Sequence, residues 1–82
     1  MDNFAFSPAH LGVRAGTTVV WTNHDTARHS TTSDGGVWDS GLFDEEERFS
    51  FKFDLPGVYP YYCSAHGGMG GAGMSAEVTV IP

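Results

Sequence analysis

The sequence predicts an all-β fold, a β-sandwich built from short strands in a single domain. Short segments alternate between apolar and polar residues, clusters of turn-forming residues separate them, and no segment has helical periodicity or helix caps. The chain is also rich in glycine, with 11 residues, and in aromatic residues, with six Phe, three Tyr and two Trp. That composition is typical of a small β domain with many turns, and the aromatic content argues against disorder. Because 82 residues leave room for only one core, we expect one domain over residues 1–82.

Six segments are expected to be strands, because each is rich in apolar, aromatic or β-branched residues and most alternate with period two. In order, they are the segment around Phe4 and Phe6, the segment around Leu11 and Val13, residues 17–22, residues 49–53, residues 58–62, and a closing strand around Val78 and Val80. Within residues 17–22, we expect Val19 and Trp21 to share the inner face.

The intervening segments are expected to be turns and loops. Residues 29–33 are polar and β-branched, which fits either a short strand or an extended loop. The acidic run at residues 44–47 is expected to be solvated. Seven residues, 67–73, are dominated by glycine and are expected to form an extended loop, in which glycine permits positive φ and tight bends.

The charge balance excludes one class of partner. The formal net charge is -6 and only four residues are Lys or Arg, so nucleic acid is not expected to bind. An acidic surface suits either attraction towards a cationic protein patch or simple solubility. No apolar run reaches the length of a membrane span, and we expect this chain to carry neither a membrane span nor a signal peptide.

One group of residues carries chemistry. Cys63 is the only cysteine, which rules out an internal disulfide and leaves a free thiol, an intermolecular bridge, a catalytic residue or a metal ligand. His66 follows three residues later, Met74 lies beyond the glycine-rich segment, and His29 lies far upstream. Two imidazoles, one thiolate and a weak thioether are the ligands of a blue-copper electron-transfer site. In a sandwich, the loops that carry them can meet at one end of the fold.

Other interpretations of the same residues were weighed. A lone cysteine is most often a buried apolar residue, but an imidazole three residues away has no packing role, which favours a metal ligand for Cys63. His10 and His24 are both expected to lie on the surface, and His24 is the alternative to His29 as the upstream ligand. A cysteine–histidine hydrolase would need an oxyanion motif and a base-orienting motif near Cys63 and His66. This sequence has neither, so we do not expect an enzyme.

Several motifs together resemble a known family. They are Val19, Trp21, Asn23 and Asp25 leading to His29; Phe53, Gly57, Tyr59 and the run Tyr61-Tyr62-Cys63; and Gly73-Met74 followed by Val78 and Val80. Across nearly the whole chain, they resemble the cupredoxin family, of the plastocyanin, amicyanin and pseudoazurin type. The resemblance implies a Greek-key β-sandwich, one type 1 copper that cycles between Cu(I) and Cu(II), and one-electron transfer between partner proteins.

The resemblance also implies a ligand set. His29, Cys63 and His66 match the trigonal ligands, and a methionine matches the weak axial ligand. Met69 has the amicyanin-like spacing of three residues after the histidine, whereas Met74 has the family's spacing before the alternating valines of the last strand, so Met74 is favoured.

The remaining expectations concern the surroundings of the metal. Asn23 is expected to brace the ligand loop, and His66 is expected to be the electron port where redox partner proteins dock. Glu46 departs from the family pattern, because a glycine is common near this turn. We expect a monomer in an exported compartment: the periplasm, the thylakoid lumen or the extracellular side. The alternatives are a copper storage or delivery protein, or the electron-transfer domain of a larger copper protein.

Overall fold

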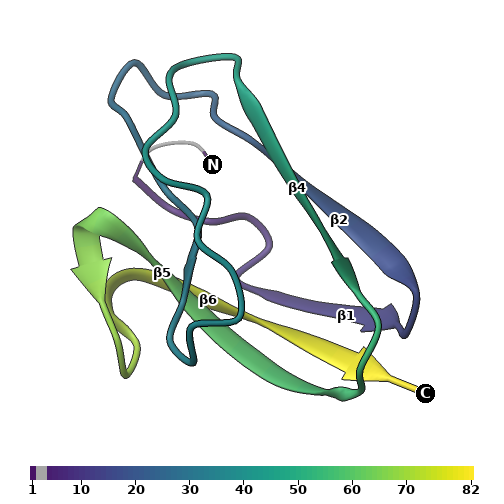
Figure 1. Cartoon of the computed structure of the whole chain (residues 1–82). Helices are drawn as coiled ribbons and strands as arrows, with labels where there is room; N and C mark the ends of the chain where they lie inside the picture. Colours follow the sequence, from purple (N-terminus) through teal and green to yellow (C-terminus); the bar gives the residue numbers. More distant parts are fainter. Residues whose placement is uncertain (2–3) are drawn as a thin grey trace.

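Two β-sheets pack face to face in the computed structural model, which describes residue 1 and residues 4–82 (Figure 1). One sheet has four strands in the order β1-β6-β5-β3, and the other consists of β2 and β4. The strands are β1 (His10–Arg14), β2 (Thr17–Thr22), β3 (Thr32–Ser33), β4 (Arg48–Phe53), β5 (Gly57–Gly68) and β6 (Ala72–Ile81). The predicted all-β sandwich is confirmed. Among the described residues, no helix is long and apolar enough to cross a membrane.

The four-stranded sheet is mixed. β6 pairs with β1 in parallel, from His10 opposite Glu77 to Arg14 opposite Ile81, and with β5 in antiparallel fashion. β2 and β4 form an antiparallel pair over their full lengths. Consequently β5 and β6, which carry most of the candidate ligands, lie in the middle of the larger sheet, with a neighbour on each side.

The core lies between the sheets and is largely aromatic. Val19 and Trp21 are buried on the inner face of β2, as the alternation predicts, and Phe53 is almost completely buried. The indole Nε1 of Trp21 donates a hydrogen bond to the hydroxyl of Tyr61 on β5, at 3.2 Å, which joins the two sheets. Burial of the phenol raises the pKa of Tyr61 above its ordinary value of 10.0, and the hydrogen bond from Trp21 opposes that shift.

The strand predicted around Phe4 and Phe6 is wrong. Phe4 lies in a turn with φ of +56°, in the left-handed region that a bulky residue rarely adopts. Phe6 is buried and packs its ring against Tyr61, so it joins the core without being part of a strand. The alternation of Phe4 and Phe6 would place both rings on one face, and it therefore misses both the turn and the exposure of Phe4. Of residues 29–33, only Thr32 and Ser33 form a strand.

The glycine-rich loop predicted for residues 67–73 is also corrected. β5 continues to Gly68 and β6 begins at Ala72, so the segment is a tight hairpin. A Cβ atom at Gly67 would lie 2.4 Å from the carbonyl oxygen of Met74, and one at Gly73 would lie 2.6 Å from that of His66. The glycines are needed here because two backbones approach closely, rather than to make the segment flexible.

The acidic run at residues 44–47 is exposed, as predicted. Asp44 accepts a hydrogen bond from Arg28 at 2.7 Å, and the backbone N–H of Glu46 donates to the carbonyl of Asn23. Glu46 has φ of +68°, a conformation suited to glycine. The turn where the family often has glycine thus keeps its left-handed backbone, but with a glutamate.

Candidate metal centre

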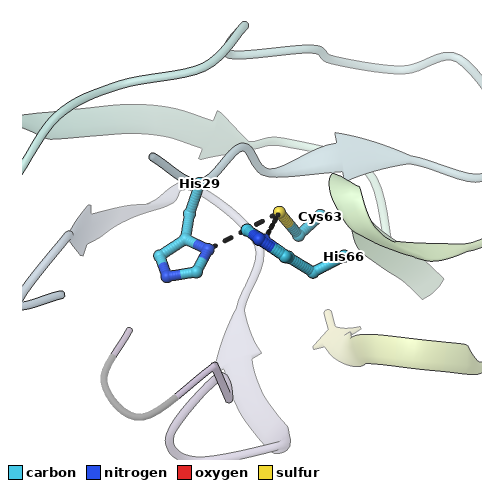
Figure 2. A group of neighbouring side chains, drawn as sticks. All are labelled: His29, Cys63 and His66. Atoms are coloured by element: carbon cyan, nitrogen blue, oxygen red, sulfur yellow. Dashed lines mark hydrogen bonds between the residues drawn. The ribbon is translucent and has the colours of Figure 1, made fainter. Parts of the chain in front are cut away.

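Three predicted ligands come together at the end of the molecule where β5 turns back into β6 (Figure 2). The Sγ atom of Cys63 lies 3.7 Å from Nδ1 of His29 and 3.4 Å from Nδ1 of His66. One ligand atom from each residue falls within 4.8 Å of the other two. His29 therefore meets two residues, Cys63 and His66, that lie 34 and 37 positions further along the sequence. The sequence analysis predicts such a meeting for the loops of a sandwich.

A bulge in β5 positions Cys63 and His66. Tyr62 pairs with Ser75 and Gly67 pairs with Gly73, so residues 63–66 of β5 lie opposite the single residue 74 of β6. The extra residues let the strand turn one side chain inward and leave another at the surface. Cys63 is completely buried, whereas His66 is exposed. The two residues thus lie within β5, and not in a turn beyond a strand that ends at Tyr62.

The loop that carries His29 is fixed by its own hydrogen bonds. His29 is completely buried and exchanges two backbone hydrogen bonds with Phe43, at 3.2 and 2.8 Å. The side-chain amide of Asn23 donates to the carbonyls of Ala27 and Phe43, at 2.9 and 3.0 Å, and its oxygen accepts from the N–H of Asp25. These bonds are the bracing predicted for Asn23, and they hold the histidine loop from inside.

Asp25 sets the orientation of the buried histidine. Its Oδ2 lies 2.7 Å from Nε2 of His29, and a carboxylate can only accept in this contact, so the proton of the neutral imidazole is assigned to Nε2. Nδ1 then presents its lone pair towards Cys63. A carboxylate behind a metal-binding histidine fixes the tautomer and the orientation of the ring. The sequence analysis gave Asp25 no such role, although its position four residues before His29 is a usable signal.

Ser30 supports the thiol. Its backbone N–H donates to Sγ of Cys63 at 3.5 Å, and its hydroxyl donates to the hydroxyl of Ser64 at 3.0 Å and accepts from the N–H of Ser64 at 2.8 Å. This backbone donor and the pair of serine hydroxyls hold the sulfur and the neighbouring residue of β5 in place. The sequence analysis missed Ser30, because nothing in its local sequence distinguishes it from a polar loop residue.

Phe4 is a third unpredicted neighbour. Its ring meets the rings of His66 and His29 edge to face, with centroids 4.9 and 5.5 Å apart. Its backbone N–H donates to Oδ2 of Asp25 at 2.9 Å, the oxygen that His29 also contacts. The left-handed backbone of Phe4 costs about 1–3 kcal/mol unless its surroundings offset it.

The remaining candidate ligands, two methionines and two histidines, differ in their burial. Met74 is buried in the same core cluster as Cys63 and lies opposite the bulge, whereas Met69 is 65% exposed in the hairpin. Both His24 and His10 are exposed, as predicted, and neither belongs to the cluster. His10 lies 3.0 Å from the carboxylate of Glu77, and His24 lies 3.7 Å from that of Glu46.

The cluster fits a copper ion. A metal bound at about 2.0–2.1 Å to imidazole nitrogen and about 2.3 Å to thiolate, at tetrahedral to trigonal angles, separates the sulfur from each nitrogen by roughly 3.5–3.8 Å. The observed separations of 3.4 and 3.7 Å are close to this range. A mixed thiolate and imidazole set is also the chemistry that holds copper in both oxidation states. A small β-sandwich with such a cluster belongs to the class of blue-copper proteins.

Comparison with known proteins agrees with this class. The family model for copper binding proteins, the plastocyanin/azurin family, matches residues 1–81, and the chain belongs to this family. The family resemblance and the copper cofactor predicted from the sequence are thereby confirmed. Members such as plastocyanin and amicyanin are electron carriers and not enzymes, which agrees with the prediction made from the sequence.

The relatives include plastocyanins and amicyanins. A plastocyanin of Scenedesmus fuscus is 34% identical over 86 residues, covering 92% of this chain and 85% of that protein. A chloroplastic plastocyanin of Pisum sativum is 36% identical, and the match covers 93% of this chain but only 51% of that protein. The solved structure of an oxidised amicyanin variant superposes with a TM-score of 0.87 at 23% identity, covering 99% of this chain and 77% of that one, and this likeness supports the fold alone.

Proposed function

We propose that this chain is a one-domain blue-copper carrier that passes single electrons between redox partner proteins. One observation carries the proposal: the Sγ atom of Cys63 and the Nδ1 atoms of two histidines converge, and of these three residues only His66 is exposed. Burial protects the sulfur from reagents in solution, and one exposed imidazole gives partners access to the site. Membership of the plastocyanin/azurin family supports the same function.

The proposed ligands are His29, Cys63 and His66, with Met74 as the weak axial ligand. Burial of Met74 in the core cluster with Cys63, against 65% exposure of Met69, supports this choice. When bound, copper supplies the one-electron couple between Cu(I) and Cu(II). The protein holds its donors in place before the metal binds, and a site that moves little between oxidation states exchanges electrons quickly.

The exposed imidazole is the proposed electron port. Ala65 and Gly67 flank His66, so little side-chain bulk separates its ring from an approaching partner. Gly67 is unsuitable as a probe of this port, since a side chain there collides with the backbone of Met74. Gly68 is suitable, because a Cβ atom at this position meets only that of Ala72, at 3.9 Å. A bulky residue at position 68 should therefore slow electron exchange without disturbing the ligands.

Docking and location complete the proposal. The exposed acidic run at residues 44–47 would guide a cationic partner, and reversing the charges of Glu45 and Glu46 should slow association and weaken its salt dependence. We place the protein as a monomer in an exported compartment such as the periplasm or thylakoid lumen, in keeping with its plastocyanin relatives, some of which are chloroplastic.

The decisive experiment is titration of metal-free protein with one equivalent of Cu(II), alongside the Cys63→Ser variant. The wild type should develop an intense blue absorption that ascorbate bleaches, and the variant should not, because the colour requires the thiolate. Zn(II) serves as a control, since it binds the same ligands without colour. A colourless wild type, or thiol oxidation without stable binding, would refute the carrier.

The axial ligand is tested separately. We expect Met74→Leu to change the reduction potential and the visible spectrum of the copper protein, because the axial ligand tunes both. Met69→Leu is the matched control and should change neither. A potential that responds to Met69→Leu alone would assign the axial role to Met69.

A further inference from the structure

Phe4 touches the candidate site in three ways. Its ring packs edge to face on the exposed His66 and on the buried His29, with centroids 4.9 and 5.5 Å apart, and its backbone N–H donates to Asp25 at 2.9 Å. We propose that Phe4 is a positioning residue that braces the exposed histidine ligand against the buried one. This inference rests on the proposed function, because it concerns the ligands of the same site.

His66 needs such a brace more than His29 does. Among the described residues, the ring of His66 contacts the rings of Phe4 and His29, and its Nδ1 lies near Cys63. No carboxylate comparable to Asp25 is recorded behind it in the described part of the chain. The ring of Phe4 therefore contributes much of the surface that keeps the imidazole of His66 from rotating towards solvent.

The backbone of Phe4 points to the same role. A phenylalanine with φ of +56° is unfavourable, and such conformations persist where surrounding contacts impose them, most often at functional sites. Here the imposing contacts are the hydrogen bond to Asp25 and the two imidazole rings. Because Oδ2 of Asp25 also meets Nε2 of His29, a single carboxylate oxygen ties the backbone of Phe4 to the buried ligand.

Phe4 is 54% exposed, so its ring is not placed by burial in the core. An exposed phenylalanine can lose its ring with little effect on the global core, which makes its local role measurable. The matched control is Leu55, another large apolar residue, which is 72% exposed and lies in the turn between β4 and β5.

The first test uses metal-free protein and side-chain NMR relaxation of the histidine rings. In the wild type, the ring of His66 should be nearly as ordered as that of His29. Phe4→Ala should make the ring of His66 mobile on the nanosecond timescale and leave that of His29 ordered, whereas Phe4→Tyr should restore order. A ring of His66 that is equally ordered with and without the phenylalanine overturns the proposal, whatever the metal chemistry.

The second test measures how fast a chelator removes copper. Loss of a supporting neighbour typically weakens metal binding by 10–100-fold, so we expect Phe4→Ala to release copper at least about tenfold faster than the wild type. Phe4→Tyr should return the rate towards that of the wild type, and Leu55→Ala should leave it unchanged. Equal rates for Phe4→Ala and Leu55→Ala refute the brace. A wild type that forms no blue site refutes the proposed function instead, while the NMR test still decides the role of Phe4.

Discussion

The two histidines of the candidate centre lie in opposite surroundings. His29 is completely buried, exchanges backbone hydrogen bonds with Phe43 and has the carboxylate of Asp25 behind its ring. His66 is exposed, extends from a bulge and is supported by neighbouring rings. A site of this kind combines one ligand fixed by a polar network with one that remains accessible.

The difference also shows where rigidity comes from. Around His29, side-chain hydrogen bonds fix an irregular loop. Around His66, the close pairing of β5 with β6 fixes the backbone, and glycines permit that pairing. An exposed ligand can therefore rest on a rigid main chain, provided that the neighbouring positions carry no side chain.

Gly67→Ala disturbs the backbone pairing of β5 with β6 next to the exposed histidine. The new Cβ atom would lie 2.4 Å from the carbonyl oxygen of Met74, so the strands must separate. We expect the free energy of unfolding of the metal-free protein to fall by about 3 kcal/mol, measured by urea denaturation. Gly68→Ala is the control and should stay near the wild type, and equal losses for the two variants would contradict this account of the hairpin.

Asn23→Ala removes hydrogen bonds from the loop that carries the buried histidine. It removes two donors and one acceptor that fix the loop, and should cost about 2 kcal/mol in the free energy of unfolding. We also expect the visible spectrum and potential of the copper protein to change. Asn23→Asp retains the acceptor for Asp25 but sets a buried carboxylate oxygen against the carbonyls of Ala27 and Phe43, so it should lose at least as much stability. An unchanged spectrum and potential in Asn23→Ala would mean that the network stabilises the fold without tuning the site.

Tyr61→Phe tests the hydrogen bond that joins the two sheets. Burial raises the pKa of Tyr61 above 10.0, so the neutral phenol contributes to stability below pH 10, and this contribution is lost as the pH rises through the folded-state pKa. The variant should lose about 1 kcal/mol at neutral pH, because Trp21 loses its acceptor. Its stability should then fall less steeply above pH 10, as followed by denaturation at several pH values. Tyr62→Phe should keep the alkaline decline of the wild type.

Glu46→Gly should have the smallest effect, and of opposite sign. Its left-handed backbone adjoins the carbonyl of Asn23, on the side of the buried histidine. Glycine adopts this conformation without strain, so we expect a gain of about 0.5–1 kcal/mol in the free energy of unfolding, measured by thermal denaturation. A loss of stability in this variant would show that the contact between Glu46 and His24 outweighs the strain.

Much of this molecule is predictable from its sequence, for identifiable reasons. The cluster at Cys63 and His66 stands out because a lone thiol with a nearby imidazole is chemically unusual. The inner face of β2 is predictable because burial on one side of a strand leaves a period of two, seen at Val19 and Trp21. The match of Met74 to the family's spacing agrees with its burial, although its role as a ligand stays a prediction.

The failures have physical causes as well. The turn at Phe4 depends on a hydrogen bond to Asp25, 21 residues away, and has no local signature. The hairpin at residues 67–73 was predicted as an extended loop because glycine permits both open loops and close backbone contacts, and only the tertiary structure distinguishes them. The support that Asp25 and Ser30 give to the ligands likewise arises from contacts that form only in the folded chain.

The parallel pairing of β1 with β6 has a consequence for how the protein is made. It joins residues 10–14 to residues 77–81, so the larger sheet cannot be completed until residues 77–81 have emerged from the ribosome. Contacts so distant in sequence form slowly, since a long loop must close first. Until then, the thiol of Cys63 is not buried as it is in the folded chain. The growing chain therefore passes through a stage in which its most reactive group is open to oxidation.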